Sequence, residues 1–311
     1  MRLFSREQML EKKIAVLMGG LSAEREISLK TGNACLKALQ ELSYQAIAVD
    51  AGPDLPEQLR EGKIDVAFIA LHGRFGEDGR VQGLLEMLQI PYTGSGVLAS
   101  SLAIDKVMTK KMLLYHELPT PGFEFMRPGD SSEQLLERCH HLPLVVKPSR
   151  EGSTIGITIA RSQEALRDGI DSAAALDGTV LVEEYIDGVE LTVSVLNGEA
   201  LPIIQIVPKT GFYDFHAKYT AGETEYLLPA PIDADCYHRI QQVAVSACAT
   251  LGCRGAARVD FMLREREFYC IEVNTIPGMT ETSLLPKAAA KAGIGFPQLV
   301  EQILLDAGLD K

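Results

Sequence analysis

Hydrophobic and polar positions in the first third of the chain repeat in two periods. Short apolar runs at 13–18, 44–49 and 66–71 predict buried strands, and segments with helical spacing separate them. Strands that alternate with helices predict a parallel sheet, whose ligands gather at the carboxyl ends of its strands. We therefore expect a doubly wound α/β domain over residues 13–96.

Strands dominate the pattern in the remainder. We expect them, in chain order, at 142–147, 157–160, 179–185, 189–196, 200–207, 258–263 and 267–273, with helices at about 162–175, 233–251 and 284–305. Asn197-Gly198 between two of these strands is a strong hairpin signal. This α+β pattern predicts a central lobe over 97–187 and a C-terminal lobe over 188–311. Residues 1–12 are too charged for a signal sequence, and we expect a frayed leader there.

The hairpin near the C-terminus carries the main candidate chemistry. Arg258 and Asp260 share one face of a strand, and Glu272 and Asn274 share a face of the next. With a connection of about three residues, Arg258 lies opposite Glu272 and Asp260 lies diagonally within reach. Two carboxylates and an amide suit Mg²⁺, which takes further ligands from substrate phosphates. The alternative is a cross-strand ion pair between Arg258 and Glu272 that only stabilises the hairpin.

Glycine-containing loops follow several of the predicted strands. They span 19–22, with Ser22 as an expected helix N-cap, then 72–79, 148–156 and 274–280. Glycine and serine let backbone N–H groups approach phosphate oxygens, although no Walker motif or G-x-G-x-x-G is present. The aromatic loop 210–224 is typical of a lid.

Composition limits the class of protein. The chain has 311 residues, 46% of them hydrophobic, and a net charge of −12, which argues against nucleic acid or an anionic membrane as partner. Six cysteines without metal spacing, and no apolar run of about 18 residues, are typical of a cytoplasmic protein with reduced thiols. An anionic ligand must therefore be held by a local group of basic side chains. Lys147, at the end of an apolar strand, either extends to solvent or meets such an anion.

These motifs together resemble the D-alanine:D-alanine ligase family of the ATP-grasp superfamily. The resemblance runs from about residue 13 to the C-terminus and rests on the segments 19–26, 71–74, 76–79, 92–96, 147–153, 212–214, 217–219, 258–260 and 272–280. It implies an ATP-grasp fold whose two lobes enclose the nucleotide. It also implies ligation of two D-alanine molecules through an acyl phosphate, for bacterial peptidoglycan synthesis. A homodimer is the habit of the family.

The resemblance implies roles for residues that bind ATP and metal. The residues implied to bind ATP are Lys106, Lys147, Ser153, Glu183, Ile186, Glu190 and Lys218. The lysines and Ser153 would contact the phosphates, Glu183 and the backbone of Ile186 the adenine, and Glu190 the ribose. The metal ligands implied are Asp260, Glu272 and Asn274, which would hold two Mg²⁺ ions, with Mn²⁺ as an alternative.

The resemblance also implies residues for the amino acids. Those implied to act in catalysis are Glu24, Ser153, Lys218, Tyr219, Arg258 and Gly278, and those at the substrates are Glu24, His72, Ser283 and Leu284. Arg258 and the Gly278 N–H would stabilise the oxyanion, and Glu24 would take the ammonium of the first D-alanine. Tyr219 follows the pattern of enzymes whose second substrate is an amine rather than D-lactate.

Two alternatives remain from the sequence. One is an ATP-grasp ligase for another acid and amine, which would lack the set of Glu24, Ser153 and Tyr219. The other is a nucleotide-binding regulatory protein without catalysis, which would have degraded metal ligands. Arg258 and the three candidate ligands are all present.

Overall fold

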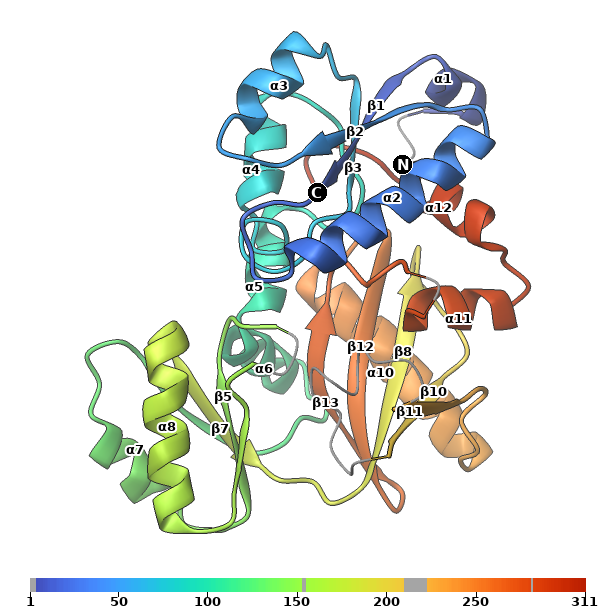
Figure 1. The fold of residues 1–311 in the computed structure, drawn as a ribbon. Helices are drawn as coiled ribbons and strands as arrows, with labels where there is room; N and C mark the ends of the chain where they lie inside the picture. Colours follow the sequence, from blue (N-terminus) through green and yellow to red (C-terminus); the bar gives the residue numbers. More distant parts are fainter. Residues whose placement is uncertain (1–3, 153–154, 210–222, 281) are drawn as a thin grey trace.

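The computed structural model describes residues 4–152, 155–209, 223–280 and 282–311. Within these ranges the chain forms three β-sheets with helices packed against them (Figure 1). No helix of the described residues is long and apolar enough to cross a membrane. All six cysteines are free thiols, as expected from the sequence.

The N-terminal domain is the predicted doubly wound unit. Its elements are α1 (Arg6–Leu10), β1 (Lys13–Met18), α2 (Arg25–Glu41), β2 (Gln45–Asp50), α3 (Leu55–Glu61), β3 (Val66–Ile69) and α4 (Arg80–Met87). The strands are parallel, in the order β2-β1-β3. Ile14 and Val16 of β1 pack in a core with α2, whereas Ala15 and Leu17 pack with α3 and α4 on the other face. Burial on both faces explains the continuous apolar run of β1.

The leader is folded, so the expectation of a frayed segment is wrong for residues 4–12. Ser5 caps α1 in a capping box with Gln8, and Met9 is fully buried in the core. The Arg6 guanidinium lies 2.8 Å from Glu301 of the C-terminal helix α12. Phe4 and Leu10 pack against the same core as Met9, so three apolar side chains among the charged residues hold the segment in place.

Two helices lead into the central lobe, which is a four-stranded antiparallel sheet. The elements are α5 (Val97–Ile104), α6 (Lys106–Tyr115), β4 (Phe123–Met126), α7 (Ser132–Arg138), β5 (Leu144–Pro148), β6 (Thr158–Ala160), α8 (Gln163–Asp177) and β7 (Val180–Glu184). The strand order is β4-β7-β5-β6. Leu166 and Ile170 of α8 pack on Val146 and Val182 of the sheet. The opposite face of the sheet is therefore left for the neighbouring lobe (Figure 1).

The C-terminal lobe contains the largest sheet. Its elements are β8 (Val189–Leu196), β9 (Glu199–Ala200), β10 (Ile204–Pro208), β11 (Thr224–Leu227), α10 (Ala234–Leu251), β12 (Ala256–Arg264), β13 (Glu267–Asn274), α11 (Leu284–Lys291) and α12 (Phe296–Leu304). The strand path is β11-β10-β8-β12-β13, with β9 beside β8. Val259 and Phe261 of β12 pack on α10. Arg258, Asp260 and Met262 therefore face the other side. Asn197 and Gly198 both have positive φ, as a tight hairpin turn requires.

The register of the β12–β13 hairpin differs from the expected one. Asp260 lies opposite Glu272, and Arg258 opposite Asn274, instead of Arg258 opposite Glu272. The connection between the strands has two residues rather than three. The register also shifts after Asp260, which leaves Ile271 as an extra residue. Direct pairing places the Cα atoms of Asp260 and Glu272 closer together than the predicted diagonal arrangement.

Candidate active site

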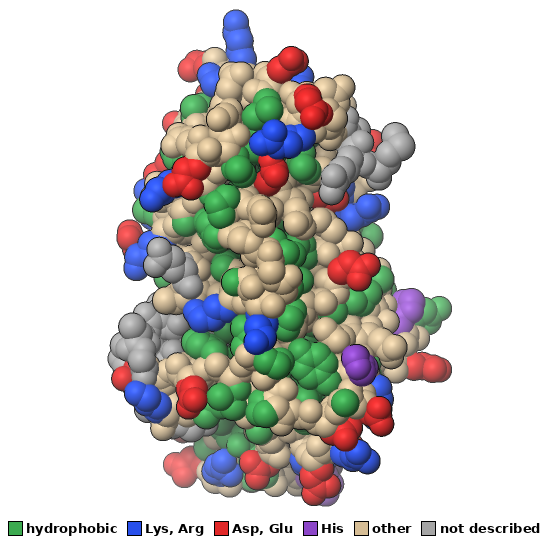
Figure 2. Space-filling view, turned by 90° about the vertical axis from the view of Figure 1, so that its right-hand side faces the viewer, with side chains coloured by type: hydrophobic (Ala, Val, Ile, Leu, Met, Phe, Trp, Pro, Cys, Tyr) green, Lys and Arg blue, Asp and Glu red, His purple; other side chains and the backbone are tan. Residues whose placement is uncertain are grey.

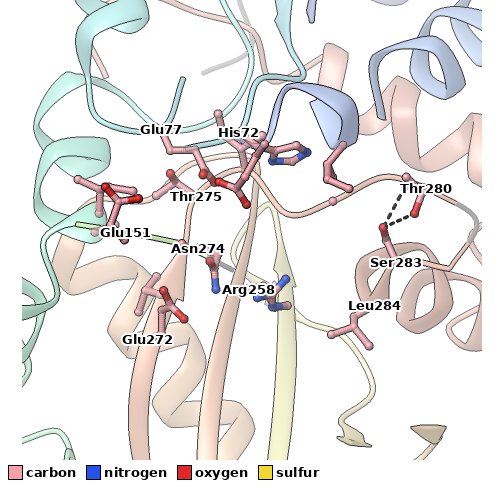
Figure 3. Close-up of a pocket in the computed structure, with 18 of the residues that line it drawn as sticks. His72, Glu77, Glu151, Arg258, Glu272, Asn274, Thr275, Thr280, Ser283 and Leu284 are labelled. Atoms are coloured by element: carbon pink, nitrogen blue, oxygen red, sulfur yellow. Dashed lines mark hydrogen bonds between the residues drawn. The ribbon is translucent and has the colours of Figure 1, made fainter. Parts of the chain in front are cut away.

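Two adjoining cavities lie beside the hairpin. The first, which we call the large cavity, has a volume of about 310 Å³ and lies between the central and C-terminal sheets. The second, the small cavity, has a volume of about 130 Å³ and lies between the N-terminal domain and the C-terminal sheet (Figure 3). Glu151, Gly152 and Glu272 line both cavities. A ligand in one cavity can therefore meet a ligand in the other at this shared wall.

The large cavity has apolar walls and a charged end. Alternation along β5 turns Val145 and Lys147 into the cavity while Val146 is buried in the core behind them. The other apolar lining residues include Ile157, Ile159, Ile186, Ile206, Met262 and Ile271. Ile271 reaches the cavity beside its neighbour Glu272 because of the register shift in β13. Flat apolar walls with a few polar groups suit a planar base.

A buried carboxylate between two lysines forms one charged group of the large cavity. Glu183 Oε1 contacts Lys147 Nζ, and Glu183 Oε2 lies 2.7 Å from Lys110 Nζ. Burial alone would raise the pKa of Glu183, but the two ammonium groups outweigh it and hold that pKa below its ordinary value. Burial opposes the charge on Lys147, yet Glu183 raises the pKa of that lysine. Burial lowers the pKa of Lys110.

Lys106 joins the large cavity to the shared wall. It is the first residue of α6, which Asp105 caps by accepting a hydrogen bond from Met108 N. Lys106 Nζ donates to the Glu151 carbonyl at 2.8 Å and lies 2.9 Å from Glu272 Oε1. Its side chain is only 7% exposed. The predicted phosphate lysine thus occupies a fixed position at the boundary of the two cavities.

The three predicted metal ligands converge on the same wall. Asp260 accepts hydrogen bonds from Thr192 Oγ1 at 2.6 Å and from the Arg258 Nε and Nη2 atoms at 2.9 Å each. Asn274 Nδ2 donates to Asp260 Oδ2 at 3.2 Å. Arg258 thus pairs with Asp260 on its own strand, which differs from the cross-strand ion pair with Glu272. Two carboxylates and an amide in this arrangement fit Mg²⁺ that completes its shell with phosphate and water. Among the residues that the structure describes, no group of three His, Cys, Asp or Glu adds a rival metal site.

The small cavity brings N-terminal loops against the hairpin. Figure 3 shows Glu77 and His72, which come from the loop after β3, above Arg258 of β12 and Asn274 of β13. Glu24 also lines this cavity. The predicted substrate residues from distant parts of the chain therefore meet at one site.

Glycines allow the Glu24 carboxylate to reach the small cavity. A Cβ atom at Gly73, whose φ is +68°, would lie 2.6 Å from Glu24 Oε2, and one at Gly152 would lie 3.2 Å from it. Glu24 itself is the N-cap residue of α2, although it makes no side-chain capping bond. The expectation of Ser22 as N-cap is wrong, because Ser22 Oγ donates to the His72 carbonyl and accepts from Glu24 N. Ser22 thus ties the first loop to the second.

Two titratable side chains in the small cavity have shifted pKa values. Burial, and then the Arg258 guanidinium, lower the pKa of His72 to about 4, so the imidazole is neutral at neutral pH. Its Nε2 atom lies 3.1 Å from Thr31 Oγ1. Burial, and then the Glu24 carboxylate, raise the pKa of Glu77 to about 8. Glu77 Oε2 accepts a hydrogen bond from Gly73 N at 2.6 Å.

The loop after β13 closes the other side of the small cavity. Thr280 N donates to Ser283 Oγ at 3.0 Å, and the two hydroxyl oxygens lie 2.8 Å apart (Figure 3). A Cβ atom at Gly278 would lie 2.9 Å from Ser283 Oγ. Leu284 begins α11 behind them and also lines the cavity. The predicted Pro-Gly substrate loop therefore places backbone and hydroxyl groups beside the cavity.

Most predicted site residues thus line one cavity or the other. Ser153, Lys218 and Tyr219 lie outside the described residues. The sequence interpretation assigned no role to Glu77 or Lys110. A signal for Lys110 was present, because it follows Lys106 by four residues and therefore lies on the same face of α6. Glu77 belongs to the glycine-containing loop 72–79, but nothing in the sequence indicates that it approaches Glu24.

Known proteins match this chain over nearly its whole length. Residues 50–95 match the family described as D-ala D-ala ligase N-terminus, and residues 112–305 match D-ala D-ala ligase C-terminus. The D-alanine–D-alanine ligase of Syntrophotalea carbinolica is 60% identical over 306 residues, which cover 98% of this chain and 99% of that protein. The ligase of Pelotomaculum thermopropionicum is 50% identical and covers 94% of this chain and 95% of its own length.

Solved structures agree with the sequence matches. A crystal structure of D-alanine–D-alanine ligase from Bacillus anthracis has a TM-score of 0.85 and 37% identity, covering 94% of this chain and 96% of that one. A second one, complexed with ATP, has a TM-score of 0.83 and 34% identity over 95% of this chain and 97% of the other. These matches confirm the predicted ATP-grasp fold and the class of enzyme. The chain belongs to the D-alanine–D-alanine ligase family.

Proposed function

We propose that this protein joins two D-alanine molecules at the expense of ATP, in the cytoplasm, to supply D-alanyl-D-alanine for peptidoglycan synthesis. The observation that carries the proposal is the pair of adjoining cavities, which meet at Glu272 beside Arg258. A phosphoryl donor in one and a carboxylate in the other would face each other across that wall. A homodimer, the habit of the family, belongs to the same proposal.

ATP binds in the large cavity. Its adenine lies between the apolar walls, near Glu183 and the Ile186 backbone, and its ribose lies near Glu190. Its phosphates extend toward Lys147 and Lys106, and the resemblance to the family implies that Ser153 and Lys218 would contact them as well. The Bacillus anthracis relative was solved with ATP, which supports this choice of nucleotide.

Asp260, Glu272 and Asn274 would hold two Mg²⁺ ions at the shared wall. When bound, these ions neutralise phosphate charge and align the transferring group. The position of Asp260 is already fixed by hydrogen bonds from Thr192 and Arg258. The protein therefore provides ligands whose rotamers are set before the nucleotide arrives.

The first D-alanine binds in the small cavity. Its ammonium group pairs with Glu24, and the resemblance to the family implies that Ser153 and Tyr219 would hydrogen-bond to this carboxylate. Neutral His72 packs beside the substrate without adding a positive charge. The D-alanine carboxylate lies toward Arg258, where an oxygen can attack the γ-phosphorus of ATP and release ADP.

The second D-alanine then attacks the acyl phosphate. Its carboxylate is received by Ser283 and the Leu284 backbone, which directs its amine at the activated carbonyl carbon. Arg258 and the Gly278 N–H stabilise the oxyanion, and collapse of the tetrahedral intermediate releases inorganic phosphate. The closed cavity keeps water away from the acyl phosphate until the amine arrives.

The proposal is tested by measuring ADP release with ATP, Mg²⁺ and D-alanine, together with the mass of the product. We expect one ADP for each D-alanyl-D-alanine formed. ADP release only with another acid or amine would indicate a different ligase. Nucleotide binding without ADP release under any of these conditions would indicate a regulatory protein.

The choice of the second substrate needs its own experiment. Offered D-lactate and D-alanine together near neutral pH, the enzyme should form the dipeptide in preference to the ester, because Ala217-Lys218-Tyr219 follows the dipeptide pattern. The two products differ in mass and in stability toward base. Preferential ester formation would contradict the assignment of an amine substrate.

A further inference from the structure

Lys110 is a buried cation that lies behind the large cavity rather than in its lining. Its side chain is 1% exposed. Lys110 Nζ lies 2.7 Å from Glu183 Oε2 and donates to Thr120 Oγ1 at 2.8 Å. Thr120 Oγ1 in turn donates to the Cys270 carbonyl on β13 at 2.8 Å. The ammonium is thus anchored to the C-terminal sheet on one side and to Glu183 on the other.

Glu183 divides its two oxygens between two lysines. Lys147, on Oε1, lines the large cavity, whereas Lys110 holds Oε2 from the protein side. Without Lys110, the carboxylate could turn both oxygens to Lys147. The Glu183 side chain would then lose its fixed orientation, and its carboxylate would neutralise the whole charge of Lys147.

The net charge of the buried group formed by Lys110, Lys147 and Glu183 is positive, and so favours an anionic ligand, only when Lys110 is present. Two ammonium groups and one carboxylate leave one net positive charge, and Lys147 is the member that faces the cavity. Removing Lys110 makes the group neutral. In a low-dielectric site, that difference acts strongly on a nearby triphosphate.

We propose that Lys110 is a positioning residue of the nucleotide pocket, which fixes the Glu183 carboxylate toward the base and leaves Lys147 available to the phosphates. This inference rests on the proposed function, because it requires that the large cavity hold ATP. Lys110 reaches no substrate itself and acts through Glu183.

The test is steady-state kinetics of the full-length Lys110→Met variant. We expect KM for ATP to rise about tenfold or more, while kcat and KM for D-alanine stay within about threefold of wild type. Discrimination of ATP against GTP, measured as the ratio of kcat/KM values, should fall because Glu183 is less fixed. Lys110→Arg keeps the charge and should restore much of the affinity for ATP. The matched control is Lys111→Met on the same helix, since Lys111 packs over the Phe125 ring instead of Glu183.

A double-variant experiment separates positioning from general stability. If Lys110 acts through Glu183, adding Lys110→Met to Glu183→Gln should change KM for ATP by no more than about twofold beyond Glu183→Gln alone. The inference is overturned if the effects of the two changes on KM for ATP multiply in the double variant. It is also overturned if Lys110→Met has the same KM for ATP as the Lys111→Met control, or if Lys110→Met lowers only the active fraction of the protein and its Tm.

Thr120→Val keeps the inference testable if Lys110→Met does not fold. It retains the charge of Lys110 but removes the hydroxyl that holds it, and we expect a several-fold rise in KM for ATP. An unchanged KM in folded Thr120→Val would count against the inference. Wild-type protein is measured first. Absence of D-alanine-dependent ADP release there would refute the proposed function, whereas active wild type with an unaltered Lys110→Met refutes only the role of Lys110.

Discussion

Replacing Glu272 by glutamine separates its proposed role as a metal ligand from a structural ion pair. Glu272 lies on the wall shared by both cavities, and its Oε1 atom is 2.9 Å from Lys106 Nζ. Glutamine has the same length, and its side-chain oxygen can still accept a hydrogen bond from Lys106. The change therefore removes charge while it preserves shape.

The expected losses in stability and in turnover differ widely. Solvent screens the ion pair only in part, because Glu272 is 26% and Lys106 7% exposed, but the glutamine oxygen still accepts from the ammonium, so the change should cost about 1 to 2 kcal/mol in free energy of unfolding. For a chain of this size, that is a fall of about 2 to 6 °C in Tm. Weakened stabilisation of the transferring phosphoryl group should instead lower kcat about 100-fold to 1,000-fold.

The assay combines ADP release at saturating ATP and D-alanine with thermal unfolding of the same samples. Glu199→Gln is the matched control, because Glu199 is an exposed glutamate beside the Asn197-Gly198 turn. It should leave both quantities unchanged. If Glu272→Gln loses turnover only in proportion to its unfolded fraction, the hairpin carboxylate is structural and the reasoning fails.

Three further predictions follow from the geometry. Gly73→Ala should raise KM for D-alanine about tenfold, because its Cβ would lie 2.6 Å from Glu24 Oε2. Gly198→Ala is also at positive φ but in open space, so it should cost only about 1 kcal/mol of stability and leave KM unchanged. Kinetics and urea unfolding of both variants test this pair. Glu77, with its pKa raised to about 8, binds a proton more tightly when folded, so its contribution to stability declines as pH rises from about 4.5 to 8. Glu77→Gln should therefore be more stable than wild type at pH 8.5, by on the order of 2 kcal/mol, and the difference should shrink toward pH 5; a constant difference across that range would contradict the shift. Met9→Ala should cost about 3 kcal/mol in thermal or urea unfolding because Met9 is fully buried, and a cost near zero would mean that the leader is not docked in solution.

The sequence predicted the parts of the fold that depend on local chemistry. Short apolar runs identified the parallel strands of the N-terminal domain, and Asn197-Gly198 identified a hairpin because both residues tolerate positive φ. The sequence could not predict the register of the β12–β13 hairpin, since nothing in the residues of the two strands marks Ile271 as the extra residue. The burial of Met9 was also hidden, because the core that it joins is assembled from segments far apart in the chain, from β1 to α12.

In the candidate site, too, the sequence predicted contacts between residues close in the chain but not those between residues far apart. Arg258, Asp260, Glu272 and Asn274 could be grouped because they lie on adjacent strands of one hairpin. The partner of Lys110 could not be identified, since Glu183 lies on β7, far along the chain from α6. Burial of a lysine is likewise invisible in a helix whose neighbouring positions are also polar. Tertiary contacts, rather than residue type, give Lys110 its proposed role.

Ion pairs in the cavities explain how an acidic chain can hold an anionic nucleotide. The face seen in Figure 2 offers no obvious attraction, because acidic and basic side chains are interspersed among its described residues. Inside, Lys106 is paired with Glu272 and Arg258 with Asp260, and both carboxylates are proposed metal ligands. If a bound cation took over the charge of those carboxylates where they stand, the same basic groups could contact phosphate and carboxylate oxygens. On this proposal the ion pairs keep the buried charges balanced before ATP arrives, and they would couple binding of the metal to binding of the nucleotide.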